Sequence, residues 1–157
     1  MVNNKIVRNV FIFTLMGTII WLILIFMAPF LKSIDSPVNA FIYSIFAPIC
    51  HQNSTRCFYF WDYPGAVCTR CLGIYLGFLL GTLAFPLING FKPVHPPKNI
   101  IFFVFSTPIV MDTIGNLLTL WQTSDWMRAI IGLIWGILLP YYFIPGISDL
   151  FLSLNSS

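Results

Sequence analysis

Residues 67–89 read VCTRCLGIYLGFLLGTLAFPLIN and decide the fold, because this apolar stretch carries a single charge, Arg70, close to its start. About 20 apolar residues cross a hydrocarbon core of about 30 Å as one helix. Three further stretches share this length and polarity, and they cover residues 9–31, 100–121 and 126–152. The sequence therefore predicts an all-α integral membrane protein with four transmembrane helices, built as a single membrane domain over residues 1–157.

The composition supports this class. The chain is 58% hydrophobic and 8% charged, with a mean hydropathy of +0.86, whereas soluble domains carry about 25% charged residues. A net charge of +3 without a run of lysines or arginines excludes nucleic acid as a partner. The predicted partner is the lipid bilayer, and the predicted location is the cell membrane, as a multi-pass protein.

Residues 37–50 are apolar but too short for a span, which predicts an interfacial or re-entrant helix. A polar and aromatic loop over residues 50–71 follows it. If the short helix does not cross the membrane, Lys5 and Arg8 lie on the face opposite this loop. Lys92 and Lys98 then share the face of the N-terminus, and Lys32 lies on the other face with the arginines of the site. With those arginines set aside as site residues, the charge rule for short loops favours a cytoplasmic N-terminus and an extracytoplasmic loop. If the short helix crosses, the loop is cytoplasmic instead.

Glycines recur every four residues in two of the predicted spans, at Gly73, Gly77, Gly81, Gly132 and Gly136. Small residues at this spacing let helix backbones approach closely in lipid. The pattern predicts close helix packing, and a homo-oligomer through these glycine faces is a further possibility.

The third span contains an ionisable residue, Asp112, which lies nine residues before Trp121 and thus about 13 Å below the membrane face. Together with Gly115, Asn116 and Thr119 it forms a polar stripe along one helix face. Intramembrane carboxylates normally face a partner or a water-filled cavity. A guanidinium entering from the same face, that of Arg128, would be such a partner.

Two interpretations of this charge arrangement stay open. One is a purely structural pair of Asp112 and Arg128. The other is a pocket in which three arginines share one internal acid, so that the surplus positive charge binds an anion such as a phosphate or a lipid headgroup. The second interpretation makes Asp112 and Arg128 candidate catalytic residues. Its ligand-binding residues are Arg56, Arg70, Arg128 and Asn116.

The cysteines gather in the same region. Cys68 and Cys71 form a C-x-x-C motif at a predicted helix start, where the helix dipole stabilises thiolates. Together with Cys50 and His51 they offer three thiolates and one imidazole, a ligand set typical of zinc that other transition metals also use. Replacing His51 by Cys57 would give an all-thiolate site.

Three alternatives to this metal site remain. A membrane thiol–disulfide oxidoreductase would need only Cys68 and Cys71. The cysteines could also be buried hydrophobic groups or form structural disulfides. A small transporter or lipid-binding protein would use a titrating Asp112, with the metal serving only to fasten the loop. Whether the protein is an enzyme stays open.

The string Cys50-His51-Gln52, followed by Arg56 and then by the C-x-R-C-x-G-I-Y-x-G pattern of residues 68–77, resembles the predicted membrane proteins of domain of unknown function 2085. A second part of that family's pattern matches Pro108, Asp112, Arg128, Gly132 and Gly136. The resemblance covers residues 45–137. It implies a membrane fold and sharpens the list of site residues, but the family has no described reaction.

This sequence departs from the family pattern at four positions. Thr113 stands where glycine is usual, and Leu72 and Ile131 replace threonines. Cys57 stands where serine is usual. The resemblance therefore favours Cys50, His51, Cys68 and Cys71 as the metal ligands, with Cys57 outside the set.

Overall fold

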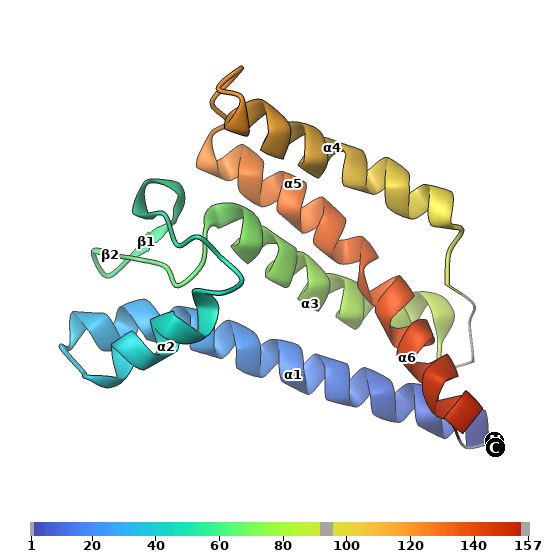
Figure 1. Ribbon diagram of the computed structural model, residues 1–157. Helices are drawn as coiled ribbons and strands as arrows, with labels where there is room; N and C mark the ends of the chain where they lie inside the picture. The colour runs from blue at the N-terminus through green and yellow to red at the C-terminus, as the bar shows by residue number, and fades with distance from the viewer. Residues whose placement is uncertain (1, 92–95, 155–157) are drawn as a thin grey trace.

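The computed structural model describes residues 2–91 and 96–154 (Figure 1). Its helices are α1 (Val2–Ser33), α2 (Val38–Phe46), α3 (Thr69–Asn89), α4 (Asn99–Leu117), α5 (Asp125–Leu138) and α6 (Pro140–Leu154). A 3-10 turn, η1 (Ser54–Arg56), and a two-stranded ribbon, β1 (Tyr59–Phe60) with β2 (Tyr63–Pro64), lie between α2 and α3. Within the described residues, α1, α3, α4 and α5 with α6 supply four stretches that are long and apolar enough to span a membrane. The predicted all-helical membrane fold, with one additional short helix, is confirmed.

The third span ends earlier than the sequence predicts, at Leu117 rather than at Trp121. Thr119 adopts a left-handed backbone with φ of 57°, and the amide of Leu120 donates to the carbonyl of Gly115 at 2.9 Å. This is the hydrogen-bond pattern that closes a helix after a left-handed residue. Asp112 consequently lies only about 7.5 Å from the helix end, instead of about 13 Å.

The last span bends at a proline. α5 ends at Leu138 and α6 starts at Pro140, whose ring removes a backbone donor from the helix ladder. The chain continues in helical form, because the amide of Phe143 donates to the carbonyl of Leu139 at 2.9 Å.

The glycine faces of α3 and α5 pack directly on each other, as their spacing predicts. A Cβ atom added to Gly73, Gly77 or Gly81 would overlap a backbone carbonyl of α5, and one added to Gly132 or Gly136 would overlap a carbonyl of α3. The two backbones are therefore in contact over three helical turns. Because the faces pack within one chain, association between copies stays a prediction.

Near the turn after α2, a compact apolar core joins the loop to α1. Phe46, Ala66 and Val67 are almost fully buried and pack with Ile25 and Ala28 of α1. This core holds the segment before α3 against the end of the first span.

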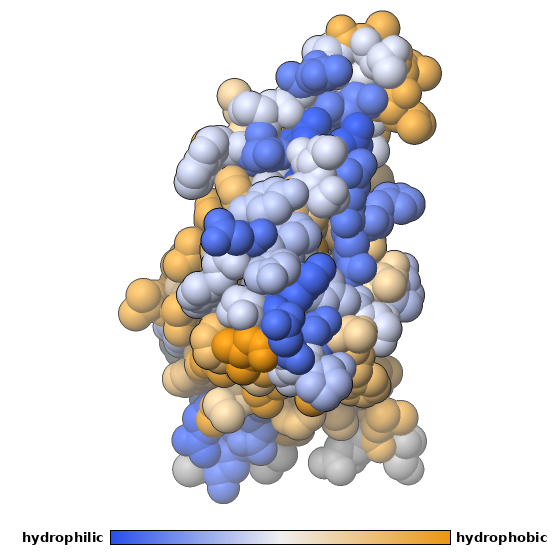
Figure 2. All heavy atoms as spheres, turned by 90° about the vertical axis from the view of Figure 1, so that its left-hand side faces the viewer, coloured by the Kyte–Doolittle hydropathy of each residue, from blue (hydrophilic) through white to orange (hydrophobic). Residues whose placement is uncertain are grey.

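The elements that carry the predicted site residues meet at one end of the bundle. The end of α1, α2, the ribbon, the start of α3, the end of α4 and the start of α5 all lie at the left of Figure 1, whereas α1 begins at the opposite end. Figure 2 shows this end from outside, with hydrophilic residues running down much of its height and hydrophobic ones mainly to either side and below. The nine residues of α2 are too few to cross a bilayer. The beginning of α1 and the loop over residues 50–71 thus lie at opposite ends of the bundle. Lys92, predicted to share the face of the N-terminus, lies outside the described residues.

Candidate metal centre

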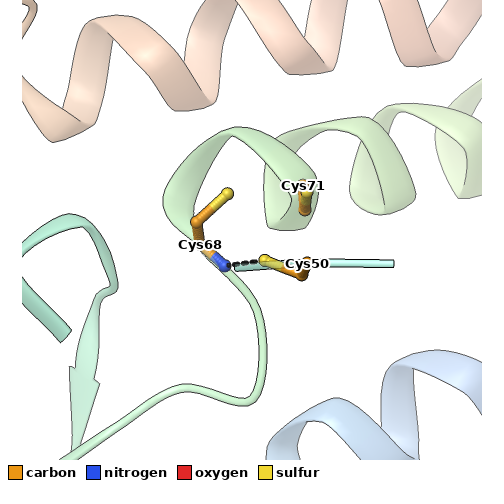
Figure 3. Close-up of side chains that lie close together, drawn as sticks. All are labelled: Cys50, Cys68 and Cys71. Carbon is orange, nitrogen blue, oxygen red and sulfur yellow. Dashed lines mark hydrogen bonds between the residues drawn. The ribbon is translucent and has the colours of Figure 1, made fainter. Parts of the chain in front are cut away.

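Three thiols meet at the start of α3. The Sγ atoms of Cys50, Cys68 and Cys71 lie within 4.8 Å of one another (Figure 3). Cys50 follows the end of α2, Cys68 caps the N-terminus of α3 with an extended backbone, and Cys71 lies in the first helical turn. The structure therefore brings together three of the four predicted metal ligands.

Gln52 fastens the loop that carries Cys50. Its backbone is left-handed, with φ of 47°, and its side-chain amide donates to the carbonyl oxygens of Tyr43 at 2.7 Å and Ala66 at 2.9 Å. These two bonds tie α2 to the segment that precedes Cys68. Gln52 belongs to the C-H-Q string of the sequence, but the string alone assigns no role to its side chain.

The pKa values of Cys50 and of Cys57, the cysteine outside the cluster, are shifted in opposite directions. Hydrogen bonds from the thiols of Cys68 and Cys71 lower the pKa of Cys50 to about 2, and the Cys68 amide donates to its sulfur at 3.1 Å. Burial, reinforced by the charges of Cys68 and Cys50, raises the pKa of Cys57 to about 12. The Cys57 thiol instead donates to the carbonyl of Asn53 at 3.2 Å. Cys57 is thus a protonated, buried thiol.

The donor set fits a zinc ion. Zinc–sulfur bonds of about 2.3 Å in a tetrahedron place the sulfurs about 3.8 Å apart, so the three Sγ atoms would need to move only slightly. His51 is exposed and is not part of this group, although it lines the neighbouring cavity. Its role as the fourth ligand stays a prediction.

A cavity of about 710 Å³ opens beside the three thiols, and it is called the thiol cavity below. Its walls include the sequence-predicted side chains of Cys50, His51, Arg56, Cys68, Arg70, Cys71 and Arg128. Residues spread over almost eighty positions of the chain therefore line one space at the membrane face.

Asp112 pairs with Arg70, not with Arg128 as the sequence analysis proposed. Its carboxylate accepts from Arg70, from the hydroxyl of Thr123 and from the amide of Asn116, the last at 2.9 Å. Asn116 lies one turn nearer the membrane face and separates Asp112 from Arg128. The amide oxygen of Asn116 accepts from Arg128 at 2.9 Å, which explains why the predicted pair does not form.

A second acid changes the charge balance of the site. Asp125 pairs with Arg128 at 3.2 Å and was not among the predicted site residues. Its position three residues before Arg128 at a helix start is the signal that would have found it. Two of the three arginines therefore have a carboxylate, whereas the guanidinium of Arg56 has no hydrogen bond or ion pair within residues 2–91 and 96–154. Arg56 supplies the surplus positive charge.

Comparison with known proteins identifies the family of the chain. The sequence profile of the DUF2085 predicted membrane proteins matches residues 50–142, more than half of the chain. The chain belongs to this family. It is also similar to an uncharacterized protein of Methanocaldococcus jannaschii, with 27% identity over 144 residues that cover 88% of this chain and 92% of that protein. No solved structure matches the chain. The family match includes the three clustered cysteines, all three arginines and Asp112.

The network predicts that Asp112→Asn lowers the free energy of unfolding by about 2 kcal/mol, because it leaves the partly buried Arg70 without its counter-charge. Thermal unfolding of the purified protein in detergent measures this loss. The matched control is Asp125→Asn. Asp125 is itself partly exposed, so water screens its pair, and Arg128 keeps its hydrogen bond to Asn116; the loss should therefore stay below about 1 kcal/mol. Equal losses in the two variants would contradict the assignment of Asp112 as the buried anchor of Arg70.

Proposed function

We propose that this membrane protein holds a zinc ion with Cys50, Cys68 and Cys71 and binds a phosphate-bearing anion in the thiol cavity. The observation that carries the proposal is that three mutually close sulfurs and three arginines line a single cavity. Thiolates bind borderline-soft divalent ions, and guanidinium groups bind phosphate. A zinc ion with an open position beside guanidinium groups suits an anion whose oxygens contact both.

Three cysteine ligands leave one coordination position of zinc open for water, for an oxygen of the bound anion, or for His51. With an open position, bound zinc supplies Lewis-acid chemistry at the wall of the cavity. With His51 as the fourth ligand, the zinc is closed and fastens the loop to α3. The wall position of His51 supports either state, and the reaction, if there is one, depends on which is populated.

The arginines divide between two roles in this proposal. Arg56 is exposed and unpaired in the described part of the chain, so it contacts the anion directly. Arg70 and Arg128 are held in position by Asp112 and Asp125. Because three donors already face its carboxylate, Asp112 suits a positioning role better than proton transfer, and a catalytic role for Asp112 or Arg128 stays a prediction.

Metal content tests the proposal. The protein purified in detergent, with reductant and without chelator, should retain about one zinc per chain by elemental analysis. Cys68→Ser should lose this metal because it removes one of three ligands. Cys57→Ser is the matched control, since Cys57 is a buried cysteine of the same loop outside the cluster, and it should keep its zinc.

Three outcomes would oppose zinc binding. Wild-type protein without metal and with freely alkylated cluster cysteines would refute the site, as would equal zinc loss in Cys57→Ser and Cys68→Ser. A Cys68–Cys71 disulfide that still cycles in Cys50→Ser would favour the thiol–disulfide oxidoreductase, which uses the same sulfurs.

We further propose that the N-terminus is cytoplasmic and that the thiol cavity faces outward. The exposed basic residues at the opposite face, Lys5, Arg8 and Lys98, support this orientation. An impermeant maleimide should label Ser54→Cys in intact cells, and should label Lys98→Cys only after permeabilisation. Both positions are exposed, and wild-type protein sets the background. The reverse labelling pattern would place the thiol cavity in the cytoplasm.

A further inference from the structure

A second cavity of about 370 Å³, called the amide cavity below, adjoins the thiol cavity. It lies over the turn between α4 and α5, and its walls include Asn116, Trp121, Gln122 and Ser124. Arg56 and Arg128 line both cavities. The two spaces therefore share a wall of two guanidinium groups.

Arg56 is the group best placed to bind an anion at this shared wall. Its backbone is fixed by η1, where the Arg56 amide donates to the carbonyl of Asn53 at 2.9 Å and the Asn53 side chain caps the turn. Its guanidinium has no protein partner in the described residues, whereas Arg128 already bonds Asp125 and Asn116. A phosphate bound to Arg56 would therefore lie between the thiol cavity and the amide cavity.

The amide cavity differs from the thiol cavity in its chemistry. Its lining combines hydroxyls, carboxamides, the carboxylate of Asp125 and the indole of Trp121, without a cysteine. The Asn116 carboxamide is already bonded to Asp112, Thr123 and Arg128, so Gln122 carries the carboxamide that faces a ligand. Carboxamides both donate and accept hydrogen bonds, as hydroxyl groups of a ligand do, and an indole offers an apolar face to a carbon skeleton. The Gln122 amide has no hydrogen-bond partner within residues 2–91 and 96–154, so it is free for a ligand.

We propose that the amide cavity binds the hydroxyl-bearing part of a phosphate ester whose phosphate lies on Arg56. This inference rests on the proposed anion site and names its ligand class, a polyol phosphate of the glycerol phosphate type. A phospholipid headgroup and a water-soluble ester both present this chemistry at a membrane face.

Calorimetry of the zinc-loaded, full-length protein in detergent tests the ligand class with sn-glycerol 3-phosphate and inorganic phosphate as probes. Glycerol phosphate should bind about tenfold more tightly, because only it reaches the amide cavity. Gln122→Ala should weaken glycerol phosphate about fivefold and leave inorganic phosphate unchanged. Arg56→Gln should weaken both probes about tenfold, and Arg8→Gln, an exposed arginine at the opposite face, should weaken neither.

The outcomes separate this inference from the proposed function. Equal binding of the two probes, or no effect of Gln122→Ala, would overturn the amide cavity as a subsite while the zinc and anion sites stand. Binding of neither probe to zinc-loaded protein would overturn the anion site itself. Nanodiscs with phosphatidylglycerol that displace glycerol phosphate would identify a lipid headgroup as its source, and retention of glycerol phosphate would identify a soluble ester.

Discussion

The backbone contact between α3 and α5 is the constraint on which the site depends. Glycines replace side chains along the whole contact, so Arg70 at the start of α3 and Arg128 in the first turns of α5 lie at the same membrane face. Apolar burial gives little drive between helices in lipid, and close backbone packing supplies the attraction instead. Any residue larger than glycine on this face would separate the helices and widen the cavity between the arginines.

The packing of α3 against α5 also places two of the arginines next to aspartates, so that most of the charge at this end of the bundle is paired. Arg70 with Asp112 and Arg128 with Asp125 form two neutral pairs, and Asn116 links them through hydrogen bonds to Asp112 and Arg128. Paired charges are tolerated near lipid because each guanidinium keeps a partner. The unpaired Arg56 lies on an exposed turn, where water lowers the cost of a free cation. The same arrangement leaves one positive charge available to a ligand.

The sequence was sufficient for the spans and for the gathering of the site residues, because long apolar runs and glycine spacing are dictated by the bilayer itself. The helix end at Leu117 was not predictable, since a threonine rarely adopts the left-handed backbone that Thr119 has. The partner of Asp112 depends on how far the side chains of Arg70 and Arg128 reach into the bundle. The spacing of these residues along the chain does not determine that reach. The link made by Gln52 likewise depends on carbonyl groups that come together only in the folded loop.

The proposed zinc site requires three cysteines from two separated segments to coordinate one metal ion. X-ray absorption at the zinc edge of the purified protein measures the ligands directly. We expect three sulfur neighbours at about 2.3 Å and one nitrogen or oxygen neighbour at about 2.0–2.1 Å. A spectrum without a sulfur shell, or one with four sulfurs that brings Cys57 into the site, would contradict it.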